Sequence, residues 1–291
     1  MLARAARRTL MFVIALFLVA SAWELYKLVG PTGGGNVVGM PVLPKSSDRA
    51  MPHTWDMARR LFEPETSGAD ADVMWLAVTK YAWYTARMAL GGLMLGAVIG
   101  IGLAVLMARF RFVERGLLPW VIMSQTVPLI ALAPQVVSWS GRFDLFGWEW
   151  PRWASVCVLA AFLSFFPIAV GTLRGLSAAP TASLELMDSY AASWGQQLVK
   201  LRFPAAVPHI VPALKLAATL SVVGVIVSEI STGISGGIGR AVLSYAQAAT
   251  GDPAKAYSAV FGAAVLGLTL YGAVVALDAF LMRNRPRESL Q

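Results

Sequence analysis

The sequence predicts an all-α integral membrane protein that crosses the bilayer six times. Of its 291 residues, 57% are hydrophobic and only 14% are charged, whereas soluble domains average about 45–50% apolar and about 25% charged residues. Apolar runs close to the ~20-residue length of a membrane-spanning helix recur along the chain. A soluble protein of this size could not bury so much apolar surface, so the composition fits a protein dissolved in lipid.

Six apolar segments are long enough to span a membrane. The third contains Pro119, Pro128 and Pro134, so we expect it to be kinked or broken. Proline is tolerated in membrane helices when neighbouring groups satisfy the freed carbonyls. The expected spans are residues 9–29, 85–108, 117–139, 153–173, 210–230 and 257–282.

Basic residues gather in alternate loops, before the first span and after the second, fourth and sixth. Short cytoplasmic loops carry an excess of lysine and arginine, so both termini are predicted to be cytoplasmic. The formal net charge of +8 then reflects topology rather than nucleic-acid binding. The residues that set this orientation are Arg4, Arg7, Arg8, Arg109, Arg111, Arg115, Arg174, Lys200, Arg202, Arg283, Arg285 and Arg287.

The first span resembles a secretory signal because Ala20-Ser21-Ala22 looks like a cleavage site. The apolar run continues past it through Leu28, which favours an uncleaved anchor. The expected organisation is a tail and first span over 1–30, an extracytoplasmic loop over 31–80, a five-helix core over 81–283 and a tail over 284–291.

Within the extracytoplasmic loop, residues 55–62 have an amphipathic pattern. Trp55, Ala58, Leu61 and Phe62 share one face at helical spacing. We expect a short helix that either lies on the membrane interface or packs on the other segments.

Glycines recur every four residues in the second span, at Gly92, Gly96 and Gly100. This spacing places them on one helix face. Small residues let membrane helices approach closely, so tight packing is expected, with a role in gating as the alternative. In the sixth span, Ala263, Gly267 and Gly272 form a similar row of small residues.

The chain offers few groups for metal or nucleotide chemistry. It has one cysteine, Cys157, and two histidines, His53 and His209, so no internal disulfide or four-ligand zinc site is expected. Cys157 lies in an apolar run and is expected to be a small buried residue. No Gly-x-x-x-x-Gly-Lys-Ser/Thr loop is present. The chain is therefore expected to hold no cofactor and to hydrolyse no ATP itself.

The segment 177–208, predicted to be cytoplasmic, is long for a loop but has a helical pattern. Pro180 suits the first turn of a helix. Ser193 and Gln196 form the pattern of a capping box, so a second helix should begin there. Pro204 and Pro208 are expected to close it, which gives a short helix–turn–helix.

This segment resembles the cytoplasmic loop of binding-protein-dependent ABC importer permeases, whose signature is Glu-Ala-Ala, then Gly, then Leu-Pro. Aligning the closing prolines places Glu185 on the signature glutamate and Ala191 on the glycine. A second frame places Gly195 on the glycine and Ser189 on the glutamate. The residues implied in coupling to an ATPase are Glu185, Leu186, Met187, Asp188, Ala191, Ser193, Gly195, Pro204 and Pro208.

The resemblance extends over residues 73–283 and is nearest to permeases of the nitrate, sulfonate and taurine type, a subgroup that also includes importers of thiamine-pyrimidine and riboflavin-like nutrients. It implies the type I importer permease fold in a bacterial cell membrane. It also implies three protein partners: an ATPase subunit that carries ATP and Mg²⁺, an extracytoplasmic substrate-binding protein, and a second permease copy in a homodimer.

Polar residues inside spans are candidates for a substrate pathway. Gln125 and Thr126, in the middle of the third span, and Ser221 in the fifth are the candidates here. Lys215, Asp278 and Glu229 lie near span ends, where they could snorkel or pair.

Two other functions remain open from the residues alone, a gated channel and a membrane-integral enzyme. An enzyme should show clustered acids, histidines or a nucleophile–base pair at one depth, and the histidines here are far apart. A channel would need a pore ring but no docking helix pair.

Overall fold

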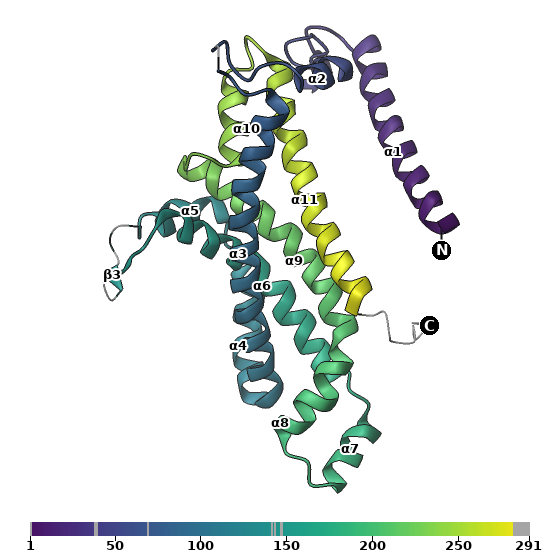
Figure 1. Ribbon diagram of the computed structural model, residues 1–291, viewed down its shortest axis with the longest axis vertical. Coiled ribbons are helices and arrows are strands. Elements are labelled where there is room, and N and C mark those ends of the chain that lie inside the picture. Colours follow the sequence, from purple (N-terminus) through teal and green to yellow (C-terminus); the bar gives the residue numbers. More distant parts are fainter. Residues whose placement is uncertain are drawn as a thin grey trace. The chain divides into compact units, whose positions relative to one another are not determined.

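The computed structural model describes residues 2–37, 40–68, 70–140, 142, 144–145 and 148–281 (Figure 1). Long helices dominate, and the strands form two short antiparallel hairpins. The elements are α1 Leu2–Val29, β1 Gly35–Val37, β2 Met40–Leu43, α2 Thr54–Arg60, α3 Met74–Arg109, α4 Arg111–Ser124, α5 Leu129–Val137, β3 Asp144–Leu145, β4 Trp148–Glu149, α6 Arg152–Ser177, α7 Thr181–Ser189, α8 Trp194–Gln197, a π segment Leu198–Arg202, α9 Phe203–Thr232, α10 Ile238–Gln247 and α11 Pro253–Leu281.

Within the described residues, five helices are long and apolar enough to cross a membrane, and a bent pair adds a sixth if it counts as one span. These helices coincide with the six apolar segments of the sequence. The predicted basic cluster Arg283, Arg285 and Arg287 and the tail 284–291 lie outside the described residues.

The proline-rich third span is broken, as the sequence predicts, and α4 and α5 meet at 95°. Only one of its three prolines lies at the break. Pro119 lies inside α4 and Pro134 inside α5, whereas Pro128 precedes α5 with φ −68° and ψ 117°. Proline fixes its own φ and disfavours helical backbone in the residue before it, so the chain turns at Pro128.

The predicted end of the second loop helix at Pro204 and Pro208 is wrong. The chain is helical from Trp194 to Thr232, passing through the π segment Leu198–Arg202. Pro204 lies in the first turn of α9 and Pro208 lies inside it. Proline has no N–H to donate, but Pro204 follows directly after the π segment, where the helical hydrogen-bond pattern already changes. The continuous helix therefore accepts a proline that in the sequence looks like an end.

The chain divides into two compact units, one of residues 1–80 and 241–261 and the other of residues 81–240 and 262 onward. The segment 241–261, which the sequence assigns to the core, groups instead with the N-terminal part of the chain.

In the second unit, α6 is the most deeply enclosed span, with 61% of its most apolar stretch buried. The face of α3 that carries Gly92, Gly96 and Gly100 lies directly against it. A Cβ at Gly100 would lie 2.7 Å from the carbonyl oxygen of Phe165. Close backbone contact of this kind supplies the packing energy that a hydrophobic effect cannot supply in lipid.

The glycines of the sixth span behave differently. A Cβ at Gly267 or at Gly272 would meet nothing within 4 Å. The expectation that they repeat the packing device of α3 is therefore wrong for this chain on its own. Cys157 is buried, as predicted.

In the first unit, the end of α1 is fixed to the loop that follows it. Trp23 donates its indole N–H to the carbonyl of Pro52 at 3.0 Å, and the Tyr26 hydroxyl donates to the carbonyl of Pro44 at 2.8 Å. The predicted short amphipathic helix is α2, which Arg60 links to Asp252 through an ion pair of 2.6 Å. These contacts tie described parts of the loop to α1 and to the segment that precedes α11.

Candidate coupling site and polar residues of the spans

The helix pair α7 and α8 projects beyond the ends of α6 and α9 (Figure 1). No residue of α7 is buried. Leu186 is 58% exposed, and Tyr190, just after the helix, is 79% exposed. A short helix that presents large apolar side chains in this way suits a groove on a partner protein.

Hydrogen bonds fix α7 to α8. Both arms of the predicted capping box are present: the Ser193 N–H donates to Oε1 of Gln196 at 2.8 Å, and the Gln196 N–H donates to Oγ of Ser193 at 3.4 Å. The side-chain amide of Gln197 donates to Oδ1 of Asp188 at 2.6 Å and to the carbonyl of Ala192 at 3.3 Å. The pair is therefore one connected structure.

The base of this structure is anchored in the bundle. Leu176, Leu198 and Ala206 form a buried cluster against which Trp194 packs. The guanidinium of Arg109 lies 5.1 Å from the centre of the Trp194 ring. Because α8 continues through the π segment into α9, a displacement of α7 and α8 would be passed directly to a membrane-spanning helix.

Ala191 has an unusual backbone. Its φ is 52°, and it is the one non-glycine residue of the described chain with a positive φ. The left-handed region costs other residues about 1–2 kcal/mol and costs glycine almost nothing. Gly195 lies in helix α8 and does not have a positive φ, so its backbone conformation does not require glycine. The turn geometry thus supports the frame that places Ala191 on the family's glycine.

The other predicted loop residues are distributed along the same segment. Glu185 and Asp188 are exposed on α7, while Met187 is half-buried. Ser193 and Gly195 are exposed at the start of α8. Pro204 and Pro208 lie further along, on the first turns of α9.

The three candidate pathway residues are in two places. Gln125 and Thr126 lie at the break between α4 and α5, where the Gln125 amide donates to the carbonyl of Phe162 at 3.4 Å and Thr126 is exposed. Ser221 is fully buried, and its hydroxyl donates to the carbonyl of Ala89. It joins α9 to α3, so the expectation that it faces a pathway does not hold in this conformation.

Sequence reasoning missed the role of Glu229. Its side chain is fully buried and does not snorkel. The carboxylate accepts from the Thr85 hydroxyl at 2.8 Å and from the Gly239 N–H at 2.7 Å, while Oγ1 of Thr85 accepts from the Ile238 N–H at 2.9 Å. The two side chains thus satisfy the first amides of α10, where a negative charge is favoured.

A signal for this site exists in the sequence, in the run Ser235-Gly236-Gly237-Ile238-Gly239. A Cβ at Gly237 would overlap the Glu229 carboxylate, and a Cβ at Gly239 would lie 2.9 Å from its Oε2. The glycines make room for the buried acid. Elsewhere in the spans, Lys215 and Asp278, which were expected to snorkel or pair, form an ion pair with each other at 2.7 Å.

No group of three or more histidine, cysteine, aspartate or glutamate residues in the described part of the chain is arranged to hold a metal ion. Several polar side chains of the spans, among them Ser221, Glu229 and Lys215, instead hydrogen-bond or pair within the protein. An apolar bundle of this kind, with a projecting helix pair on its longest continuous helix, is the architecture of a membrane-embedded permease.

Comparison with known proteins identifies the family. Residues 75–283 match the model of the binding-protein-dependent transport system inner membrane component, and the chain belongs to this family. It is accordingly a multi-pass protein of the plasma membrane.

Several curated permeases are similar to this chain. The formylaminopyrimidine transport permease protein ThiX of Halalkalibacterium halodurans is 32% identical over 68% of this chain and 74% of its own length. The putative aliphatic sulfonates transport permease protein SsuC of Bacillus subtilis is 29% identical, over 67% of this chain and 66% of its own. The nitrate import permease protein NrtB of Leptolyngbya laminosa is 24% identical, over 91% and 84%.

Among solved structures, the crystal structure of an amino acid ABC transporter with histidines matches with a TM-score of 0.53 at 16% identity. The match covers 72% of this chain and 94% of that one. At this identity the likeness concerns the fold, and it agrees with the type I importer permease fold that the sequence predicts.

Proposed function

We propose that this chain is the permease subunit of an ATP-driven importer of a small nutrient, moved by a separate ATPase that docks on α7. The observation that carries the proposal is the exposed α7, tied by Asp188 and Gln197 to α8 and so to the continuous helix Trp194–Thr232. Rigid-body movement of the docked helix pair would tilt α9 and rearrange the bundle.

The family description supports two of the proposed partners, an ATPase subunit and an extracytoplasmic substrate-binding protein. ATP and Mg²⁺ belong to the ATPase. A second copy of the permease completes the proposed assembly. In the proposed orientation both termini and α7 lie in the cytoplasm, which follows from the basic residues at the ends of alternate spans.

The proposed cargo is a small organic or inorganic anion, such as a sulfonate, taurine or nitrate, or a heterocycle of the thiamine-pyrimidine or riboflavin kind. The names of the similar permeases cover both classes. Gln125 and Thr126, at the break between α4 and α5, remain the proposed pathway residues. Their uncharged side chains would allow the substrate-binding protein to supply most of the selectivity.

Substitutions at the α7–α8 turn test the docking. Ala191→Val places a β-branched residue in the left-handed region, so it should distort the turn and reduce co-purification of the co-expressed ATPase at least tenfold. Glu185→Lys, which reverses an exposed charge without changing the turn, should weaken the same association. Pull-down of the ATPase with tagged permease from detergent extract measures both effects.

Two matched controls accompany these variants. Ala191→Gly removes the steric cost of the positive φ at this position, so the variant should retain full association with the ATPase. Gly195→Ala adds a methyl group that meets nothing within 4 Å and should also be neutral. If Gly195→Ala lost the ATPase while Ala191→Val retained it, the result would favour the second alignment frame, in which Gly195 corresponds to the family's glycine. Undiminished association in every variant would refute docking on this loop.

A further inference from the structure

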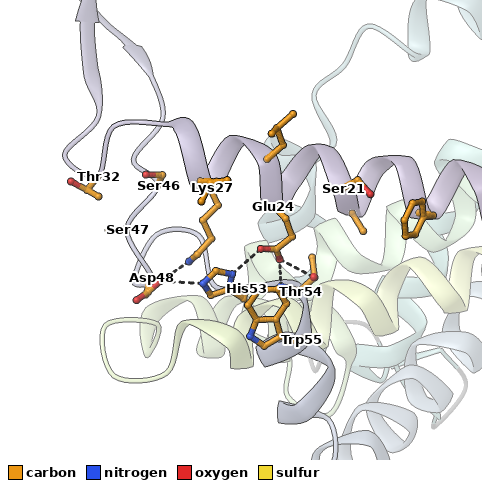
Figure 2. Close-up of a pocket in the computed structure, with 14 residues that line it drawn as sticks. Ser21, Glu24, Lys27, Thr32, Ser46, Ser47, Asp48, His53, Thr54 and Trp55 are labelled. Carbon is orange, nitrogen blue, oxygen red and sulfur yellow. Dashed lines mark hydrogen bonds and ion pairs between the residues drawn. The ribbon is translucent and has the colours of Figure 1, made fainter.

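A cavity of about 970 Å³ lies beside the C-terminal half of α1, between that helix and the segment 32–55 (Figure 2). Its α1 wall carries the apolar side chains of Phe17, Leu25 and Leu28. The opposite wall carries polar residues of the loop, among them Asp48 and His53. The cavity is therefore amphipathic.

The dimensions of the cavity match one leaflet of a bilayer. Its wall on α1 extends from Phe17 to Leu28, and a helix rises about 1.5 Å per residue. That gives a length of about 16 Å, about half of the ~30 Å hydrocarbon core. Because α1 is an apolar span that ends at Val29, the end of the cavity at Phe17 is placed among the acyl chains, and the end near Lys27 and Asp48 is placed near the lipid head groups.

Two of the charged side chains in the cavity are already satisfied. The Glu24 carboxylate accepts from the N–H and the hydroxyl of Thr54, at 2.7 and 2.8 Å, and lies 2.8 Å from Nδ1 of His53. The Lys27 ammonium, only 6% exposed, donates to Asp48 at 2.6 Å and to the carbonyl of Met51 at 2.5 Å. Neither group offers a free charge to a ligand.

Lys27 compensates only one of the two carboxylates Glu24 and Asp48, so one net negative charge remains, and the carboxylate open to solvent is that of Asp48, whose side chain is 85% exposed. The hydrogen bond and charge of Lys27 hold the pKa of Asp48 below its ordinary value of 3.8, so this carboxylate is ionised at physiological pH. Nε2 of His53 lies 4.0 Å from it, and the exposed Trp55 ring stacks on His53. A carboxylate beside aromatic rings is a site for an ammonium group.

We propose that this cavity binds one phospholipid with a primary-amine head group, such as phosphatidylethanolamine. The ammonium donates to the Asp48 carboxylate, and an acyl chain lies along Phe17 and Leu28. A lipid bound in this cavity would contact both α1 and the loop, and it would stabilise the position of α1 relative to the loop. The proposal rests on the cavity and on the membrane location of the chain, and it is independent of the proposed transport function.

Lipid competition tests the proposal on the purified full-length protein. The protein, delipidated in detergent, is mixed with equal amounts of phosphatidylethanolamine, phosphatidylcholine and phosphatidylglycerol, and native mass spectrometry counts the retained lipids. We expect preferential retention of one phosphatidylethanolamine. Asp48→Asn should reduce this preference about tenfold, because a charged hydrogen bond is lost. The asparagine oxygen can still accept from Lys27, so the loop should keep its shape.

Asp70→Asn is the matched control, since Asp70 is exposed in the same unit but does not line the cavity. It should leave the lipid preference unchanged. Ala20→Phe places a ring inside the cavity and should lower the retention of all three lipids, whatever their head groups. Equal retention of the three lipids, retention of phosphatidylglycerol or phosphatidylcholine above the amine lipid, or equal effects of Asp48→Asn and Asp70→Asn would overturn the proposal.

Discussion

At the scale of single residues, Glu229 carries a buried carboxylate without a cation beside it in the described structure. Two donors compensate it, the Thr85 hydroxyl and the Gly239 N–H, while the Ile238 N–H donates to Oγ1 of Thr85. A buried acid normally needs such bonds to offset its desolvation. Its oxygens therefore act as the N-terminal cap of α10, a role usually taken by a residue adjacent to the helix.

Removing this acid should destabilise the protein measurably. Glu229→Ala leaves the buried Gly239 N–H and the buried Thr85 hydroxyl without their acceptor and opens a cavity, so we expect a loss of about 2–4 kcal/mol in unfolding free energy. Thermal unfolding of the protein in detergent, followed by circular dichroism, measures the shift. Glu185→Ala, at an exposed position, is the control and should unfold as the wild type does. An unchanged melting temperature for Glu229→Ala would contradict the capping role.

At the scale of elements, the contact of α3 with α6 depends on three glycines spaced by one helical turn. Gly96→Ala introduces a Cβ that meets Ser164 and lies 3.1 Å from the Phe165 amide nitrogen. The two helices must separate to accept it, at a cost of about 1–3 kcal/mol. We expect lower thermal stability and a lower yield of folded protein in detergent.

Gly102 supplies the matched comparison on the same helix. A Cβ there meets nothing within 4 Å, and alanine is the better helix former by about 1 kcal/mol. Gly102→Ala should leave the melting temperature unchanged or raise it slightly. If both substitutions lowered it equally, the effect would come from the helix itself and not from its contact with α6.

The helical loop segment shows why element boundaries are harder to predict than elements. The capping box at Ser193 and Gln196 is a local feature, and it was predictable from four consecutive residues. The continuity of α8 with α9 is not local. Pro204 is compatible both with the end of one helix and with the first turn of another, and the packing of Leu198 against Leu176 and Ala206 decides between them.

At the scale of the whole molecule, the sequence predicts that the segment 31–80 and the segment 177–208 lie on opposite sides of the membrane. Three crossings separate them if the bent pair α4–α5 is one span, and two if that pair re-enters. Cysteine labelling decides whether the two segments lie on opposite sides of the membrane. In a Cys157→Ala background, Ser67→Cys and Ser189→Cys each add one exposed, nearly isosteric thiol.

A membrane-impermeant maleimide applied to spheroplasts should label Ser67→Cys directly and Ser189→Cys only after permeabilisation. The Cys157→Ala parent, with no cysteine left, should remain unlabelled. Labelling of both sites from the outside would mean that α4–α5 is re-entrant, and it would place α7 outside the reach of a cytosolic ATPase.

The composition and the lengths of its apolar runs determined, without any tertiary information, that this chain lies in a membrane and which of its segments are long enough to cross it. The glycine spacing of α3 and the capping box of α8 were also readable, because each is a property of one helix. Tertiary structure alone decided that Ser221 is buried against Ala89, that Glu229 caps α10, and that Gly267 and Gly272 face open space. A sequence pattern fixes which face of a helix a residue occupies, but which neighbour covers that face depends on contacts between segments far apart in the chain.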